Sequence, residues 1–219
     1  ALPILLILQQ PDMGTVFIIS ISVVAMIGAS GAPIRWVVGL LLVALLGGFG
    51  AVKLGVINDY QVKRLQSFVD PNADSQGAGY QLRQARITVG SGGFLGTGLF
   101  DGPQTSGRFV PEQQTDFIFT VAGEQLGFLG SGFILLLYLT IIMRAFSIAR
   151  RSTDAFGRLV CVGVLSWFAF QTFENIGMTL GLMPMTGVPL PFLSYGGSSM
   201  FANLIGFGLL QNVYARQRG

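Results

Sequence analysis

Long stretches without a charged side chain constrain the fold of this sequence more than any other feature. No Asp, Glu, Lys or Arg occurs in residues 13–34, 36–52, 125–143, 159–173 and 175–215. A membrane-spanning helix needs about 20 apolar residues, and charged residues make up only 11% of this chain. The sequence therefore predicts an integral membrane protein. It excludes a disordered chain, a coiled coil and a nucleic-acid-binding domain.

The uncharged stretches predict an all-α polytopic membrane protein, a helical bundle with a long extracytoplasmic loop that carries short interfacial helices. We expect spans near residues 14–30, 35–54, 116–143, 158–181 and 197–214, and a long outer loop over residues 56–114. Pro184, Pro189 and Pro191 predict a turn or re-entrant loop before the last helix. Residues 1–8 are apolar but too short to cross a ~30 Å core. We therefore expect the chain to be the C-terminal part of a longer protein.

Basic residues predict the orientation in the membrane. They gather at alternate ends of the expected helices, at Arg35, at Arg144, Arg150, Arg151 and Arg158, and at Arg216 and Arg218. The positive-inside rule places these ends, and with them the C-terminus, in the cytoplasm. The outer loop is also basic, with Lys63, Arg64, Arg83, Arg86 and Arg108. Long outer loops can carry basic residues without a special role. These residues are therefore either tolerated in this way or form an anion-binding surface at the membrane face.

Acidic residues beside apolar segments are the first candidates for chemistry, because such groups usually face a cavity or a partner. Asp116 lies where the outer loop re-enters the membrane, and both catalysis and capping of the following helix account for it. Asp12 is equally open to a role in the cavity or as a helix cap. For Glu124 and Glu174 a structural hydrogen-bonding role is favoured. The sequence has no His, so no imidazole competes for the role of general base.

Glycine and arginine are close together in residues 79–98. Residues 82–89 are mildly amphipathic, which predicts a short helix in the membrane interface. The glycines at 90, 92 and 93 can offer backbone N–H groups to an anion, although no phosphate-loop motif is present. Another group of small residues, Thr120, Gly123, Gly127 and Gly130, follows Asp116 at helical spacing. Close helix packing is the favoured explanation for those glycines.

Several motifs together resemble one known family. They are QPDMGT at 10–15, GYQ at 79–81, GSGG at 90–93, VPEQQTDFIF at 110–119, NIGM at 175–178 and PLPFLSYGGSS at 189–199. In this order they resemble the C-terminal part of the RodA/FtsW/SpoVE (SEDS) family of bacterial cell-wall polymerases. The wording TGVPLP at 186–191 is more similar to the elongation branch, RodA, than to the division branch, FtsW.

The resemblance implies a peptidoglycan glycosyltransferase that polymerises lipid II during cell elongation and shape maintenance. It implies a multi-pass protein of the bacterial cytoplasmic membrane, with a class B penicillin-binding protein as partner and no nucleic acid. This chain would hold the last five spans of the family fold without its N-terminal part, and would be inactive alone. The resemblance allows a divalent cation, Mg²⁺ or Mn²⁺, with unknown ligands, and implies no organic cofactor.

The resemblance places the catalytic acid at Asp116. The reaction needs a base for a sugar hydroxyl and a counter-charge for the departing pyrophosphate. We predict that the substrate is bound by Asp12, Lys63, Arg83, Gln84, Arg86, Ser91, Gly92, Gly93, Glu112, Ser194 and Ser198. Two other functions remain open, a flippase for the lipid-linked precursor and a non-catalytic scaffold of the wall synthase. The acids gather towards the outer side, which favours chemistry at that face over transport.

Overall fold

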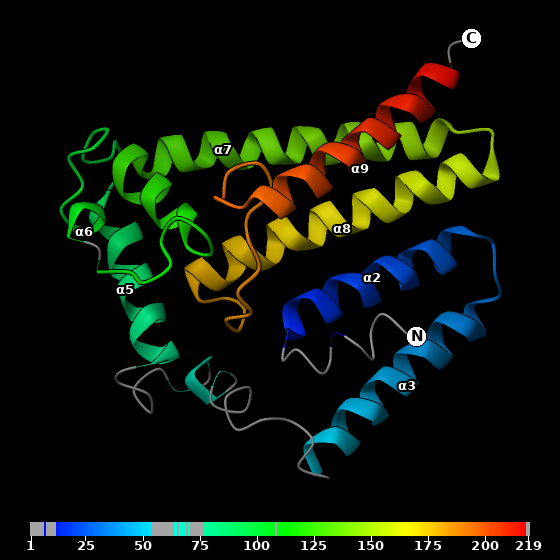
Figure 1. Ribbon diagram of the computed structural model, residues 1–219, viewed down its shortest axis with the longest axis horizontal. Coiled ribbons are helices and arrows are strands. Elements are labelled where there is room, and N and C mark those ends of the chain that lie inside the picture. Colours follow the sequence, from blue (N-terminus) through cyan, green and yellow to red (C-terminus); the bar gives the residue numbers. More distant parts are fainter. Residues whose placement is uncertain are drawn as a thin grey trace. The chain divides into compact units, whose positions relative to one another are not determined.

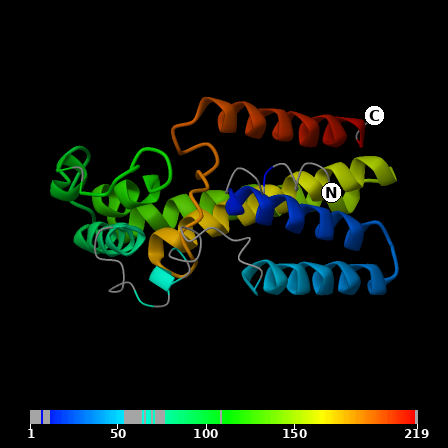
Figure 2. The same cartoon turned by 60° about the horizontal axis from the view of Figure 1, so that its bottom comes forward.

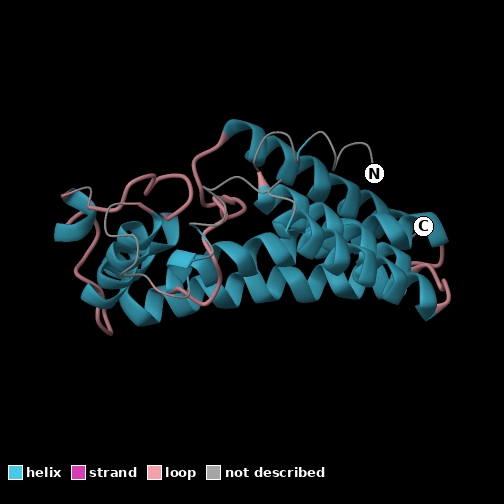
Figure 3. Cartoon of the chain, turned by 90° about the horizontal axis from the view of Figure 1, so that it is seen from below, coloured by secondary structure: helices cyan, strands magenta, loops and turns pink. Residues whose placement is uncertain are grey.

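The computed structural model describes residues 7, 12–53, 64, 66–68, 70, 77–107 and 109–217. The described residues form helices joined by loops and contain no strand (Figure 3). The helices are α2 (Met13–Ala29), α3 (Ile34–Lys53), α5 (Ala78–Ser91), α6 (Pro103–Ser106), α7 (Ile118–Arg151), α8 (Ala155–Leu180) and α9 (Gly197–Arg216). This is the all-helical class expected from the uncharged stretches.

The helices α7 and α8 are both long and apolar enough to cross a membrane. Two shorter apolar helical stretches cover Gly14–Ala29 and Ile34–Ala44. A helix therefore occupies each of the five ranges in which a span is expected. The largest difference in bounds is at α7, which continues to Arg151 instead of ending near residue 143.

The chain divides into two compact units. Unit 1 comprises Ala1–Val62, Ile142–Phe170 and Leu204–Gly219, and unit 2 comprises Lys63–Ile141 and Gln171–Asn203. In unit 1, α2 and α3 run antiparallel and side by side (Figures 1 and 2). Asp12 caps α2, because its carboxylate accepts the Thr15 N–H at 3.0 Å and the Thr15 hydroxyl at 2.6 Å. The helix-cap interpretation of Asp12 is therefore confirmed.

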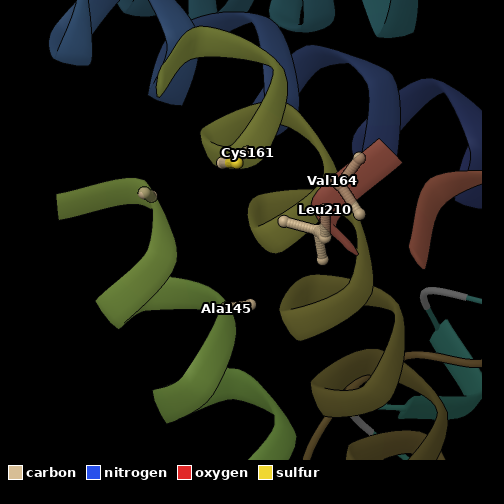
Figure 4. Close-up of a cluster of buried hydrophobic side chains, with 5 residues drawn as sticks. Ala145, Cys161, Val164 and Leu210 are labelled. Atoms are coloured by element: carbon tan, nitrogen blue, oxygen red, sulfur yellow. The ribbon is translucent and has the colours of Figure 1, made fainter. Parts of the chain in front are cut away.

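The buried cluster of unit 1 has small side chains where α7 meets α8 and α9. Ala145 and Ala149 of α7 meet Cys161 and Val164 of α8 and Leu210 of α9 (Figure 4). Small residues at such contacts let helix backbones approach closely, which is how helices pack in lipid. Unit 1 is therefore a set of closely packed helices of the kind that the apolar composition predicts.

Unit 2 contains a break in α7 that the sequence pattern did not predict. Gly127 has φ 65° and ψ −164°, so it is not helical. Its ideal Cβ would lie 2.2 Å from the backbone N of Gly96, in the loop of residues 92–102, which we call the glycine loop. The interpretation of Gly127 as part of a helix-packing surface is wrong, because glycine is needed there for a left-handed backbone and a close approach. The helix-packing interpretation is correct for Gly123, where an ideal Cβ would lie 3.1 Å from Val89 of α5.

The backbones of the glycine loop and of the broken part of α7 form hydrogen bonds with each other. Thr97 N–H donates to Glu124 O at 2.9 Å, and Gly98 N–H donates to Gln125 O at 3.2 Å. Phe128 N–H in turn donates to Gly93 O at 2.9 Å. Interrupted helices are tolerated in membrane proteins where other parts of the protein pair the freed groups, and this loop does so for α7.

Candidate functional site

Asp116 lies in the loop immediately before α7, and its backbone is fixed on both sides. Its N–H donates to Glu112 O at 3.0 Å, and the same carbonyl accepts the N–H groups of Thr115 and Phe117. The Asp116 carbonyl accepts a hydrogen bond from Asn175 Nδ2 of α8 at 2.7 Å. The Thr115 hydroxyl donates to the Glu112 carbonyl and carboxylate, so these bonds tie the loop to itself and do not cap α7.

The Asp116 carboxylate lies half-buried beside a glycine of the loop between α8 and α9. At Gly187, which has φ +78°, an ideal Cβ would lie 3.3 Å from Asp116 Oδ2 and 3.9 Å from Arg64 Nη1. A larger side chain at this position would cover the carboxylate and the guanidinium together. Gly187 therefore approaches both groups closely and places no side chain against either of them.

The surroundings of Asp116 favour its protonated form. Burial raises the pKa of Asp116 above its usual value of 3.8, the charge of Glu112 raises it further, and Arg64 and Thr115 lower it. A carboxylate with a raised pKa is a stronger base, and a catalytic base works best when its pKa is near the working pH. The same shift makes stability depend on pH. The folded state is favoured below pH 3.8, where the carboxyl group is protonated, and this stability is lost as the pH rises through the raised pKa.

The loop between α8 and α9, residues 181–196, is called the proline loop here. It has no regular secondary structure, yet Val188, Leu190 and Pro191 are buried. Buried polar side chains of α8 donate hydrogen bonds to its backbone carbonyl groups. Asn175 Nδ2 donates to Val188 O at 2.7 Å and Gln171 Nε2 donates to Pro189 O at 2.8 Å. Unit 2 thus holds the proline loop in place through one face of α8.

Further hydrogen bonds to the proline loop involve Arg64, Glu174 and Tyr138. Arg64 Nη1 donates to Met185 O at 3.4 Å, the Thr186 hydroxyl donates to Glu174 Oε1 at 3.1 Å, and the Tyr138 hydroxyl of α7 donates to Pro191 O. The structural role favoured for Glu174 is confirmed. Because Asn175 bonds both Asp116 and Val188, one amide joins the loop of the candidate base to the proline loop.

The basic residues predicted to bind substrate have different positions. Arg86 Nη2 donates to Gly181 O at 2.9 Å, at the C-terminal end of α8, where a cation is favoured by the helix dipole. Arg83 and Gln84 are partly exposed on α5, and Lys63 lies outside the described residues. A binding role for these four residues stays a prediction, and Arg86 has a structural partner in this state.

The GSGG motif does not present free backbone donors. The N–H groups of Gly92 and Gly93 both donate to Gly90 O. Ser91 donates its hydroxyl to Thr88 O at 2.7 Å. An anion bound at these groups would have to replace bonds that the chain already makes. The predicted binding role of Ser91, Gly92 and Gly93 therefore gains no support from the geometry.

The other predicted residues divide by exposure. Glu112 is exposed beside Asp116, and its charge acts on that carboxyl group. Ser194 is only 4% exposed, and its hydroxyl accepts the Leu190 N–H at 2.7 Å, so it fixes the proline loop. Ser198 is exposed in the first turn of α9. Asp12 belongs to unit 1, where its capping role is described above.

Glu124 is fully buried and acts as an internal hydrogen-bond partner. Its carboxylate accepts the N–H groups of Gln104 and Thr105, both at 2.8 Å, and the Thr105 hydroxyl at 2.5 Å. These donors belong to the short helix α6, so Glu124 caps that helix from α7. The favoured structural role is confirmed.

Three residues at the site, Arg64, Asn175 and Gly187, were not among the predicted substrate-binding residues. Arg64 was one of several basic residues of the outer loop, and nothing in the sequence distinguished it from its neighbour Lys63. Asn175 was expected only to pair with some polar group in the bundle. Its position one residue after Glu174 and four after Gln171 puts all three on one helix face, and that spacing was the available signal.

The described residues contain no group of three or more His, Cys, Asp or Glu that could hold a metal ion. Asp116 and Glu112 supply two carboxylates, which do not make a complete cage for a resident ion. The described residues therefore form no complete cage for an ion, the expected divalent cation stays a prediction, and no chemical step is derived through one.

A family model described as "Cell cycle protein", for FtsW, RodA and SpoVE, matches residues 1–219. The chain belongs to the FtsW/RodA/SpoVE family. Peptidoglycan glycosyltransferase MrdB of Escherichia coli (strain K12) is 37% identical over 217 residues, which are 99% of this chain and 58% of that protein. Stage V sporulation protein E of Bacillus subtilis (strain 168) is 42% identical over 209 residues, 95% of this chain and 56% of that protein.

Two solved structures have folds similar to that of this chain. One, titled "Structural coordination of polymerization and crosslinking by a peptidoglycan synthase complex", matches with a TM-score of 0.79 and 31% identity over 97% of this chain and 58% of that one. A mutant of the rod shape determining protein RodA of Thermus thermophilus matches with a TM-score of 0.63 and 28% identity, over 99% of this chain and 54% of that one. The chain thus spans a little over half the length of these family members, and it is a membrane protein of the same fold.

Proposed function

We propose that this chain is part of a peptidoglycan glycosyltransferase that polymerises lipid II, with Asp116 as the general base. The observation that carries the proposal is a half-buried carboxylate with a raised pKa, fixed through its backbone and with no side chain placed against it by Gly187. The names of the relatives support the same reaction, because MrdB of Escherichia coli is called a peptidoglycan glycosyltransferase.

The proposed step needs one proton acceptor and one cation. The Asp116 carboxylate takes the proton from the 4-hydroxyl of the acceptor sugar while that oxygen forms a bond to the anomeric carbon of the donor. The bond from that carbon to the pyrophosphate oxygen breaks, and undecaprenyl pyrophosphate leaves with the electron pair. Arg64 lies close enough to Asp116 for its charge to lower the pKa of that carboxyl group. We assign it the role of offsetting the negative charge on the departing pyrophosphate.

The cellular setting is part of the proposal. The basic ends at Arg35, Arg144 to Arg158 and Arg216 favour a multi-pass protein of the bacterial cytoplasmic membrane with a cytoplasmic C-terminus. A class B penicillin-binding protein is the proposed partner, supported by the synthase complex that the fold matches. Among the branches, cell elongation is proposed from the TGVPLP motif.

The role of a divalent cation is tested separately from that of Asp116. Since the described carboxylates do not form a cage, we expect EDTA to leave the thermal unfolding midpoint of the purified protein unchanged. Loss of both stability and polymerisation in EDTA, restored by Mg²⁺ or Mn²⁺, would instead indicate an ion held by the protein.

The direct test uses the full gene product that contains these residues, purified with its cognate penicillin-binding protein. Labelled lipid II is supplied with moenomycin to silence classical glycosyltransferases, and glycan products are compared for the unchanged protein and Asp116→Asn. We expect a ladder that disappears in the variant. Equal ladders would remove Asp116 from the role of base. No ladder from either folded complex would favour a flippase or a scaffold.

A further inference from the structure

The glycine loop carries an exposed apolar tip, defined as Phe94, Leu95, Leu99 and Phe100. Their side chains are 63%, 76%, 64% and 86% exposed. No charged residue occurs from residue 87 to residue 100. An apolar patch of this kind on a protein surface usually marks a site of interaction with a membrane or another protein.

The backbone holds this tip in a fixed position on unit 2. Leu129 N–H donates to Phe94 O at 3.2 Å, in addition to the bonds that join the glycine loop to the broken part of α7. Gly92 and Gly96 lie so close to α7 that an ideal Cβ would come within 2.0 Å of Gly123 O and 2.2 Å of Gln125 O. The four side chains therefore stay exposed because the loop that bears them is bonded to a helix.

The tip continues the apolar surface of α7. The rings of Phe94 and Phe128 stack with centroids 5.8 Å apart and an interplanar angle of 17°. Phe128, Leu129 and Phe133 of α7 are 69%, 51% and 62% exposed. This helix is long and apolar enough to cross a membrane, so its exposed apolar side chains are suited to contact lipid.

We propose that the apolar tip inserts into the acyl-chain region of the bilayer leaflet next to the break in α7, and so anchors the outer loop to the membrane. The bilayer is favoured over a protein partner because Thr97 is the only residue with a polar side chain between Phe94 and Phe100. A protein interface normally surrounds its apolar centre with a polar rim. Phe and Leu are also typical of segments that lie in the membrane interface. The proposal does not depend on the reaction proposed for Asp116.

The test measures the depth of spin labels at the tip. Cys161 is free and buried, so it and any cysteine elsewhere in the full gene product are replaced by alanine. Leu95→Cys and Phe100→Cys are labelled separately with a nitroxide. Ser106→Cys, at an exposed polar position of α6 in the same unit, is the matched control. The full gene product is reconstituted in vesicles of phosphatidylethanolamine and phosphatidylglycerol, without any lipid-linked sugar.

We expect labels at positions 95 and 100 to collide more with O₂, which dissolves in lipid, than with a water-soluble nickel chelate. The control at position 106 should show the reverse. Greater access of the nickel chelate at both tip positions would overturn the proposal, because the tip would then lie in water. Low access of both reagents at the tip would also overturn it, because a protein surface would cover the labels. The two tip positions are independent, so failure of one variant to fold leaves the other as a test.

Discussion

The proline loop and the glycine loop are both irregular segments of unit 2, and they are held by different chemistry. In the proline loop, side chains such as Gln171 and Asn175 donate to backbone carbonyl groups. In the glycine loop, backbone N–H groups donate to backbone carbonyl groups, as Thr97 N–H does to Glu124 O. Proline lacks an N–H group and leaves carbonyls to be satisfied, whereas glycine lets two backbones approach. Each loop therefore uses the chemistry that its own residues permit.

This difference predicts how each loop fails when it is changed. A loop held by side chains loses one bond at a time, and its neighbours can partly compensate. A loop held by close backbone contact has no room for even one added carbon, so a single methyl group should separate it from its helix. The glycine loop should thus be the more sensitive of the two to a minimal substitution.

The largest effect is expected for Gly92→Ala. An ideal Cβ at this position would lie 2.0 Å from Gly123 O and 2.7 Å from Glu124 O, which are backbone atoms that cannot turn aside. We expect a loss of about 3 kcal/mol or more in the free energy of unfolding, at the upper end of single substitutions. The measurement is the thermal unfolding midpoint of the purified protein in detergent.

Gly90→Ala is the matched control, because it lies in α5 with nothing within 4 Å of its ideal Cβ. Alanine is favoured over glycine in a helix by roughly 0.5–1 kcal/mol, so this variant should be as stable as the unchanged protein or more so. Equal losses in both variants would show that close backbone approach is not what holds the glycine loop.

The sequence predicted the elements of this fold better than the bonds between them. Uncharged stretches located the helices, because the cost of charge in lipid acts on every residue of a span. The break at Gly127 escaped prediction, since its cause is the approach of Gly96, distant in sequence. Asp116 was found through a family motif. Its neighbours Arg64 and Gly187 come from other segments, so local sequence carried no sign that they meet.

A smaller but functional effect is expected for Asn175→Ala. Its Nδ2 group donates to the carbonyls of both Asp116 and Val188 at 2.7 Å, and both would lose a buried partner. Leaving a buried acceptor unpaired costs about 1–3 kcal/mol. We expect a lower unfolding midpoint and polymerisation reduced by roughly tenfold, which corresponds to ~1.4 kcal/mol in the barrier.

Ser166→Ala is the control on the same helix, because the Ser166 hydroxyl donates, within the described part of the chain, only to carbonyls of α8 itself, those of Val162 and Gly163. It should leave both polymerisation and the unfolding midpoint close to normal. If Asn175→Ala behaves like this control, the amide does not hold the loop of Asp116 in place.

The smallest effect is expected for Tyr138→Phe, which removes only the hydroxyl that donates to Pro191 O. One hydrogen bond contributes about 0.5–1.5 kcal/mol, and the proline loop keeps its other side-chain donors. Unfolding should begin at a slightly lower temperature, with polymerisation nearly unchanged. Thr140→Val is a suitable comparison, since the Thr140 hydroxyl donates to Leu136 O in its own helix. A loss as large as that of Gly92→Ala would contradict the contrast between the loops.

The account depends most on the claim that Asp116 acts as a base in surroundings set by Glu112 and Arg64. Glu112 raises the pKa of Asp116 and Arg64 lowers it. A base must be ionised to accept a proton, so polymerisation should fall at acidic pH as Asp116 becomes protonated. The position of this acidic limb reports the pKa of Asp116.

The deciding measurement is therefore the rate of glycan polymerisation against pH for Glu112→Gln, Arg64→Gln and the unchanged protein. Asp101→Asn is the control for loss of a charge at an exposed position elsewhere in unit 2. The account predicts that the acidic limb moves to lower pH in Glu112→Gln, to higher pH in Arg64→Gln, and stays in place in the control. Limbs that coincide in all four proteins, or that move in the same direction in the first two variants, would contradict it.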